Sequence, residues 1–174
     1  MAPKLFKLSL IFFLICHNAT AQNDTSIFLK EIGWRINLPI EFKISNNHFI
    51  SKTVDVRTLL TASNAAGDFL NIACDSSDKL SSKNWLASDQ YYIVTILNAV
   101  GLKSCEVLKH HNARYQIDGK EFKIYQMDCT KHDHSILHLA FVSGFYNNHY
   151  ILVNYFFCNN PYEIFAMLNT SKFD

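Results

Sequence analysis

The alternation of apolar and polar residues predicts a β-strand near the start of the chain. In "GWRINLP" (33–39) the side chains of Trp34, Ile36 and Leu38 fall on one face of an extended segment, with polar residues between them. Pro39 cannot donate a backbone hydrogen bond to a neighbouring strand, so the strand should end there. The pattern is that of a half-buried strand.

A second alternating pattern predicts a β-hairpin. Residues 53–62 alternate, residues 68–74 follow after a short turn segment, and Gly67 stands between them, where a tight turn favours glycine. Residues 22–31 show no comparable pattern, and we expect them to be a short lead-in.

Three long extended runs occupy the second half of the chain. "EFKIYQMDC" (121–129), "SILHLAFVSGF" (135–145) and "HYILVNYFFC" (149–158) are separated by short polar turns, which predicts an antiparallel meander. The third run is apolar on both faces. A strand that is buried on both sides needs a covering layer above and below its sheet.

Residues 84–100 have the pattern of an amphipathic helix. Their apolar positions recur at steps of three and four: Trp85, Leu86, Tyr92, Ile93, Ile96, Leu97 and Val100. Gly101 suits the end of a helix, and Ser81 and Ser82 are available as N-caps.

A shorter helix is predicted at 161–169, with Asn160 as its N-cap and Pro161 at its first helical position. The tail after it should be extended. These elements predict an α+β fold, an antiparallel β-sheet flanked by helices in an α/β/α sandwich. The alternative is a cystatin- or NTF-like curved sheet on one helix, which differs in leaving the second face of the sheet open.

Several short motifs occur in the order found in a known superfamily. They are the Gly-Trp-x-Ile-x-Leu-Pro opening (33–39), one long helix at mid-chain, "IDG" (117–119) before three long strands, and a terminal helix that runs into "MLNTSKF" (167–173). Over residues 31–173 this order resembles the PsbP-like α/β/α sandwich. The resemblance implies that fold and a non-catalytic accessory role, with partners that differ among members; it supplies no catalytic residue.

The first 21 residues have the features of a secretory signal peptide. Lys4 and Lys7 precede the apolar run "LSLIFFLIC", and the small-x-small triplet 19–21 (Ala-Thr-Ala) follows. The apolar run is about half of the roughly 20 residues that a transmembrane helix needs. Cleavage after Ala21 would leave Gln22 at the new N-terminus and one domain at 22–174, secreted or periplasmic and without a transmembrane anchor.

Cys16 lies inside this apolar run after Ile15, which is not the small residue that a lipid-modified cysteine requires, so a lipoprotein is not predicted. Four cysteines remain after cleavage: Cys74, Cys105, Cys129 and Cys158. They allow three complete disulfide pairings, and buried free thiols are an equally good interpretation.

The segment "CTKHDHSILH" (129–138) gathers the residue types that bind transition metals. His132, His134 and His138 share the parity that places side chains on one side of an extended segment, and Cys129 is near them. The alternative is a β-hairpin whose turn contains histidine, with Lys131 opposing a bound cation.

A predicted strand register favours the hairpin. Closing the chain around "TKHDHS" pairs Cys129 with Ile136 and Met127 with His138, and the next turn pairs His138 with Phe156. His138 then lies between methionine and phenylalanine, as a core or half-buried residue. We therefore predict no metal site.

The same register predicts that Cys129 and Cys158 are not bonded to each other. Both would lie in one row with a strand between them, with Cα atoms roughly 10 Å apart, whereas a disulfide requires less than roughly 7 Å.

Other catalytic chemistries have weaker candidates. Ser143 lies inside a strand pattern and not on a nucleophile elbow. Cys105 and His110 are close in sequence, but a strand with polar ends explains them as well. Asp75 and Asp78 are interpreted as part of a solvated loop at the start of the helix.

The predicted turn between the last two long strands is rich in tyrosine and asparagine. "FYNNHY" places Tyr146, Asn147, Asn148, His149 and Tyr150 at or beside a hairpin tip, a composition that suits contact with a protein or a glycan. Turn geometry favours asparagine and strands favour tyrosine, so a purely structural role also explains them. We predict these five residues as a partner-binding surface.

Charge adds little: the formal net charge is +1 and 18% of residues are charged, with no basic tract for a nucleic acid. Asn23 and Asn169 fit the glycosylation sequon.

We expect an exported, non-catalytic accessory protein that binds another protein or an envelope component, with no cofactor. The alternative is a small secreted enzyme or metal-binding protein that uses His132 and His134 or Cys105 and His110.

Overall fold

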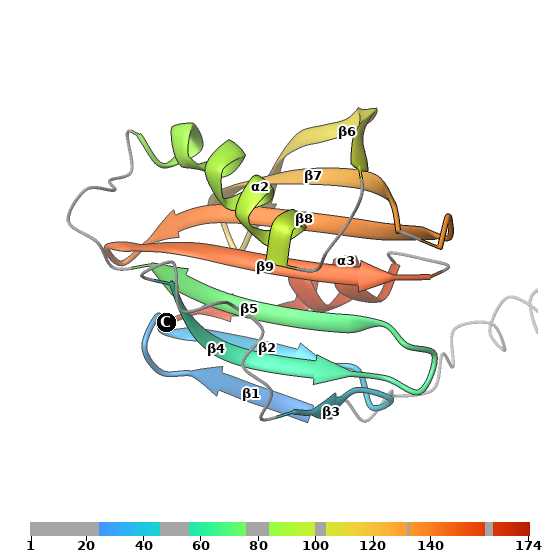
Figure 1. Ribbon diagram of the computed structural model, residues 1–174. Helices are drawn as coiled ribbons and strands as arrows, with labels where there is room; N and C mark the ends of the chain where they lie inside the picture. Colours follow the sequence, from blue (N-terminus) through green and yellow to red (C-terminus); the bar gives the residue numbers. More distant parts are fainter. Residues whose placement is uncertain (1–24, 46–55, 76–83, 100–103, 132, 159–161) are drawn as a thin grey trace, which may run out of the picture.

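The computed structural model describes residues 25–45, 56–75, 84–99, 104–131, 133–158 and 162–174 (Figure 1). The predicted signal peptide, the proposed caps Ser81, Ser82, Gly101 and Asn160, and Pro161 lie outside these ranges.

Seven strands form the larger sheet, in the order β3-β4-β5-β9-β8-β7-β6. Their bounds are Lys43–Ile44 (β3), Val56–Ser63 (β4), Phe69–Asp75 (β5), Ser104–Ile117 (β6), Lys120–Thr130 (β7), Ile136–Tyr146 (β8) and His149–Phe157 (β9). Each neighbouring pair is antiparallel. The β4–β5 hairpin with Gly67 in its turn and the β7–β8–β9 meander confirm the two predicted strand groups.

A smaller sheet has the order β1-β2-β10, with bounds Thr25–Leu29 (β1), Trp34–Leu38 (β2) and Lys172–Phe173 (β10). The expectation that 22–31 is only a lead-in is wrong for residues 25–29, because β1 pairs with β2 along its whole length. Trp34, Ile36 and Leu38 are buried while Arg35 is exposed, which confirms the face predicted for this strand.

The predicted mid-chain helix is present, but its first turn differs from an α-helix. A 3₁₀ turn, η1 (Trp85–Ser88), precedes α2 (Asp89–Ala99), and the terminal helix α3 spans Tyr162–Thr170. No helix in the described part of the chain is long and apolar enough to cross a membrane.

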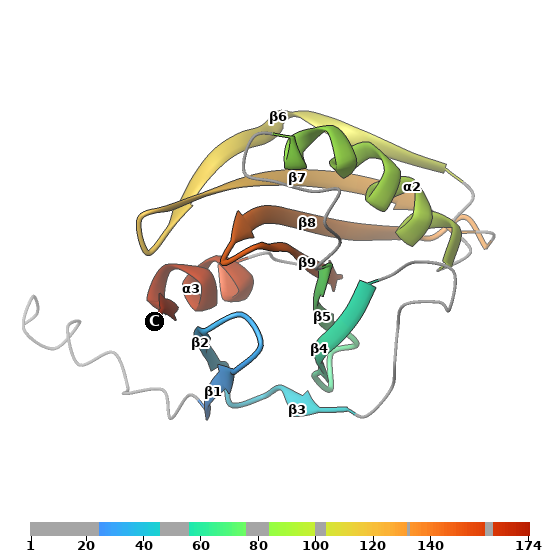
Figure 2. The same ribbon diagram turned by 90° about the vertical axis from the view of Figure 1, so that its left-hand side faces the viewer.

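The larger sheet has a hydrophobic core on each face. Figure 2 shows α2 on one side of this sheet, and α3 with β1 and β2 on the other. Strand β9 contributes Ile151, Val153, Tyr155 and Phe157 to one core, and Tyr150, Leu152 and Phe156 to the other. The first core also contains side chains of the small sheet and α3, and the second contains Trp85 and Tyr92 from η1 and α2. Side chains of η1 and α2 therefore pack on the second face of the sheet. The small sheet in the covering layer was not predicted.

A close aromatic contact joins the meander to the small sheet. Gly144 on β8 lies opposite Phe122 on β7, and the Phe122 ring is fully buried, with its centroid 6.2 Å from that of Trp34. A Cβ added at Gly144 would approach the ring carbons of Phe122 to 2.4 Å, so the ring occupies the space of the missing side chain.

We predict that Gly144→Ala lowers the free energy of unfolding by about 2 kcal/mol, because a buried ring has to move or the strands have to separate. Urea denaturation followed by tryptophan fluorescence measures the change. The double variant Gly144→Ala, Phe122→Leu should recover part of the loss, since the smaller side chain leaves room for the methyl group. Equal stability of Gly144→Ala and wild type would contradict the packing described.

Candidate functional site

The predicted tip is a two-residue turn between β8 and β9. Asn147 and Asn148 have φ angles of 48° and 59°, a left-handed conformation that asparagine tolerates better than most residues. Both are exposed, and the flanking residues Tyr146 and His149 pair with each other. The Nδ1 atom of His149 lies 2.6 Å from the Asn147 carbonyl oxygen. The turn therefore presents two amide side chains on a defined backbone.

Tyr146, at the end of β8, joins this turn to the C-terminal tail. Its ring centroid lies 4.6 Å from that of Phe173, and its hydroxyl donates a hydrogen bond to the Asp174 carbonyl oxygen at 2.6 Å. The ammonium group of Lys120 lies over the Tyr146 ring, 5.0 Å from its centroid. Tyr146 as a whole is half-buried.

Tyr150 does not belong to an exposed tip, and its predicted position there is wrong. Its side chain is fully buried between β9 and α2, where its hydroxyl donates to the Asp89 carboxylate and its ring stacks on Tyr92 at 4.9 Å. The reason is strand alternation, because residues 146 and 150 lie on opposite faces of the sheet despite their closeness in sequence. Partner binding by the other four residues stays a prediction.

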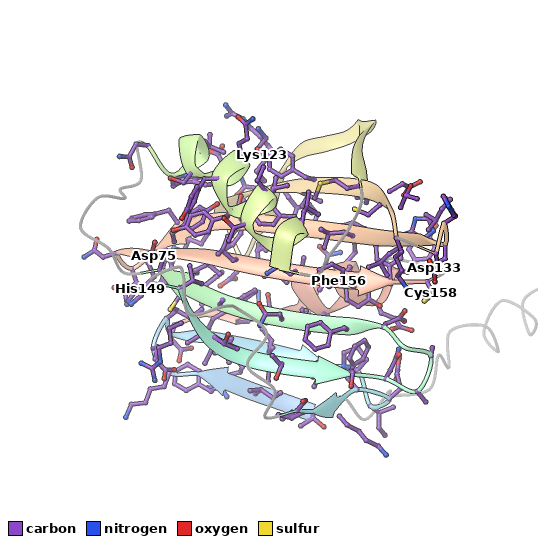
Figure 3. All side chains as sticks on the ribbon, viewed as in Figure 1. Asp75, Lys123, Asp133, His149, Phe156 and Cys158 are labelled. Atoms are coloured by element: carbon purple, nitrogen blue, oxygen red, sulfur yellow. The ribbon has the colours of Figure 1, made fainter. Side chains whose placement is uncertain are left out.

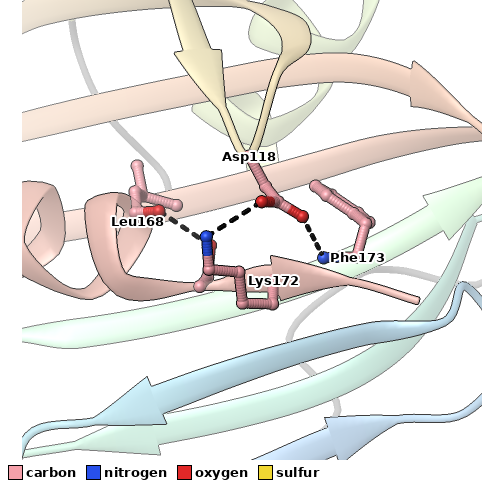
Figure 4. Close-up of polar contacts among 5 residues, drawn as sticks. Asp118, Leu168, Lys172 and Phe173 are labelled. Atoms are coloured by element: carbon pink, nitrogen blue, oxygen red, sulfur yellow. Dashed lines mark hydrogen bonds and ion pairs between the residues drawn. The ribbon is translucent and has the colours of Figure 1, made fainter.

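Asp118 binds the C-terminal tail that contacts Tyr146, and Figure 4 shows its contacts with Lys172 and Phe173. It lies in the β6–β7 turn, within the "IDG" motif, with a φ angle of 48°. One carboxylate oxygen accepts a hydrogen bond from Lys172 Nζ at 3.0 Å, and the other accepts one from the Phe173 backbone N–H at 2.9 Å. The backbone hydrogen bond, with the bond from Lys172, holds the pKa of Asp118 below its usual value.

Cys129 and His138 lie on opposite faces of the sheet. In the observed register Cys129 pairs with Leu137 and His138 with Asp128, so the predicted pairs Cys129–Ile136 and Met127–His138 are each wrong by one residue. His138 also pairs with Phe157, where Phe156 was predicted. Because side chains alternate between faces, this shift places the sulfur atom of Cys129 and the imidazole of His138 on opposite sides of the sheet.

His138 has a structural role in the described protein. Its Nδ1 atom lies 2.7 Å from Asp128 Oδ1, and its ring stacks on Phe157 with centroids 5.4 Å apart. It is half-buried, as predicted, but with different neighbours. His134 is exposed in the β7–β8 turn, and His132 lies outside the described residues. Among the residues described, no group of three His, Cys, Asp or Glu side chains is placed to hold a metal ion.

The cysteines differ in state. Cys129 is disulfide-bonded, whereas Cys74 and Cys158 are free thiols, which confirms that Cys129 and Cys158 are not bonded to each other. Burial raises the pKa of Cys74 to about 11, so it stays protonated at neutral pH. The backbone of Cys105 lies directly opposite Cys129. The side chains of Cys105 and His110 lie outside the described part of the structure, so the proposed thiol–imidazole pair is not tested.

Two aspartates on the α2 side of the sheet are buried and bonded to tyrosines. Asp89, at the start of α2, accepts a hydrogen bond from Tyr125 at 2.7 Å and another from Tyr150, and Asp75 accepts one from Tyr92. Placing Asp75 in a solvated loop is therefore wrong, because it ends β5 and is buried; Asp78 lies outside the described residues. Desolvation, followed by the charge of Asp89, raises the pKa of Tyr150, so its phenol remains a donor.

The residue pattern of α2 contains a signal for this network. Asp89 stands three residues before Tyr92 and four after Trp85, on the apolar side of the helix, where a carboxylate needs hydrogen-bond donors. Which donors it would meet is not readable from local pattern, because Tyr125 and Tyr150 come from strands 36 and 61 residues away.

A second polar group of this kind lies near the opposite end of β9. Asp68 accepts hydrogen bonds from the Asn64 side chain and from the Cys158 backbone N–H, each at 3.0 Å. The Tyr155 hydroxyl lies 3.4 Å from carboxylate oxygens of both Asp68 and Glu163. Desolvation, then the neighbouring charge of Glu41, raises the pKa of Glu163.

No protein-family model and no curated protein sequence matches this chain. Solved structures do match. Cyanobacterial PsbP from Synechocystis sp. PCC 6803 aligns over 90% of this chain and 96% of its own, with a TM-score of 0.65 and 8% identity. A Bacteroides thetaiotaomicron protein aligns over 88% of this chain and 49% of its own, with a TM-score of 0.57 and 7% identity.

LpqN, a protein involved in cell envelope biogenesis of Mycobacterium tuberculosis, aligns over 86% of this chain and 89% of its own, with a TM-score of 0.50 and 7% identity. The chain therefore has a PsbP-like fold, which confirms the predicted resemblance. At such low identity the likeness concerns the fold alone.

We predict that Tyr150→Phe lowers the free energy of unfolding by about 2 kcal/mol, because the buried Asp89 carboxylate loses a donor. Tyr91→Phe, on the exposed side of α2, is the matched control and should change stability by less than about 0.5 kcal/mol. Urea denaturation of both variants measures the difference. Equal, small effects would show that Tyr150 does not support Asp89.

Acid should loosen the C-terminal tail through Asp118. A folded pKa below the unfolded value of 3.8 means that the clamp stabilises fully above that pH and is lost as the pH falls through the folded pKa. We predict that the amide of Phe173 exchanges faster with solvent in Asp118→Asn than in wild type at neutral pH. In wild type, the protection of this amide relative to the intrinsic exchange rate at the same pH should fall below about pH 4.

Asp133→Asn is the control for this measurement, because Asp133 is another exposed turn aspartate with a lowered pKa, held by Ser135 in the β7–β8 turn. The Phe173 amide should exchange as slowly in this variant as in wild type. Faster exchange in Asp133→Asn would show that the tail responds to general charge and not to the clamp.

Proposed function

We propose that this protein is an exported, non-catalytic accessory protein that binds another protein or an envelope component through its surface. The PsbP-like fold supports an accessory role, since LpqN, which shares it, is involved in cell envelope biogenesis. The predicted signal peptide at 1–21 supports export to a secreted or periplasmic location.

The observation that carries this proposal is that the buried aspartates are hydrogen-bonded to other side chains of the protein. Asp75 and Asp89 accept hydrogen bonds from tyrosine side chains in or against the second core, and Asp68 accepts one from the Asn64 side chain. Such hydrogen bonds offset the free-energy cost of burying the carboxylates and the hydroxyl groups, and they connect neighbouring elements of the fold. General acid–base catalysis requires instead a titrating group that can reach a substrate proton.

The surface that we propose for binding is the β8–β9 turn, formed by Asn147, Asn148, His149 and the accessible part of Tyr146. Amide and imidazole groups can donate and accept hydrogen bonds, and the Tyr146 ring adds apolar contact area. The left-handed turn and the bonds to the C-terminal tail hold these groups in place before a partner arrives. A surface ordered in advance loses less entropy on binding.

A photo-reactive amino acid at His149 tests this surface in cells that produce the protein. We expect a covalent adduct with a partner at this position and none at Lys131, the matched control. Lys131 is exposed and lies two residues from Asp133, at the opposite end of the long strands from His149 (Figure 3).

The variant Asn147→Gly, Asn148→Gly should reduce the adduct about tenfold, since it removes both amides while glycine retains the positive φ angles. Its melting temperature should stay within about 2 °C of wild type, because the turn lies outside both cores. Equal adducts at positions 149 and 131, or an unchanged adduct in the glycine variant, would contradict the proposed surface.

A further inference from the structure

Cys129 is disulfide-bonded, and the position of its partner follows from the strand register. Of the five cysteines in the chain, Cys74 and Cys158 are free, which leaves Cys16 and Cys105. Cys16 lies in the predicted signal peptide, which is removed on export. Cys105 lies directly opposite Cys129 in the antiparallel β6–β7 pair. Directly opposite residues have Cα atoms about 4.5–5.5 Å apart, within the range that a disulfide spans.

We propose that Cys105 and Cys129 form a cross-strand disulfide that fastens the start of β6 to the sheet. Two thiols lose two protons and two electrons as the S–S bond forms, and the electrons pass to a second disulfide, which is reduced to two thiols by exchange. Such acceptors are kept oxidised in extracytoplasmic compartments, the location that the signal peptide predicts. The inference concerns the covalent structure and does not rest on the proposed binding surface.

The pairing of β6 explains what the bond would hold. Val107 pairs with Met127 and Asn112 with Tyr125, so residues 108–111 of β6 face Gln126 alone. This irregularity separates residues 104–107 from the rest of the strand. Strand β6 is at the edge of the larger sheet, with β7 as its neighbour. Residues 104–107 therefore pair with β7 alone, and the regular pairing is interrupted after Val107. A covalent bond to β7 would stabilise this segment more than it would a strand that is paired on both sides.

The position of Cys129 agrees with a stable bond. Its side chain is fully buried, in the core that also contains Trp85 and Tyr92 below α2. Burial limits access of a reducing thiolate to the sulfur atoms.

Peptide mapping of the purified, oxidised protein without reductant tests the pairing. After alkylation and proteolysis, mass spectrometry should recover a peptide that links Cys105 to Cys129. Cys158 should be alkylated in the native protein, and Cys74 only after unfolding, because Cys74 is buried. Alkylated Cys129, or Cys129 linked to any other cysteine, would overturn the proposal. Either result would leave the test of the β8–β9 turn unaffected.

Hydrogen exchange tests the proposed effect on β6. Reduction should accelerate exchange of residues 104–107 about tenfold while residues 114–117, beyond the irregularity, change little. Cys105→Ser should lower the melting temperature by roughly 10 °C and remove its dependence on reductant. Cys158→Ser, the matched control, should keep that dependence. Uniform acceleration in all strands, or a reductant-sensitive Cys105→Ser, would contradict the edge-fastening role.

Discussion

Strand β9 lies inside the larger sheet and buries side chains on both of its faces, and the other layers of the protein depend on this two-sided burial. Its alternate residues enter two separate cores. Each core needs a cover: η1 and α2 supply one, and α3 with the small sheet supplies the other. A strand with a single apolar face would have been stable with one open side. Here, exposing either face would place large apolar side chains in water.

Tyrosine in both cores creates a second requirement. Tyr150 on one face and Tyr155 on the other are buried to their hydroxyl groups, and a buried hydroxyl needs an acceptor. Asp89 and Asp68 provide these acceptors, and each also binds a second donor. The tyrosines lose their usual acidity because they are desolvated next to negative charge, so they remain donors. Asp89 therefore joins α2 to the sheet, and Asp68 joins the β4–β5 turn to β9.

An aspartate also connects separate elements at the end of the molecule that carries the β8–β9 turn. Asp118 holds Lys172 and Phe173, and Phe173 stacks on Trp34 and packs at a tilt against Tyr146. Tyr146 in turn donates a hydrogen bond to the Asp174 carbonyl oxygen. The turn thus rests on a chain of contacts that runs from the β6–β7 turn to the small sheet. Two exposed asparagines on a well-supported backbone suit a binding role, and the accessory function proposed for this PsbP-like fold needs no more chemistry than that.

The sequence by itself determined the local elements, because strand alternation, helical spacing and turn residues are properties of neighbouring positions. Residues 34–38, the β4–β5 hairpin, the meander and both helices were predictable for that reason. Strand β1 was not, since this short strand becomes regular only when β2 pairs with it. The shift of one residue between β7 and β8 was decided by the tertiary structure, and it moved His138 away from the face of Cys129. The burial of Tyr150 and Asp75 was decided there too, because their environment comes from α2, a helix distant from Tyr150 in sequence, and no local pattern reports which element will cover a strand.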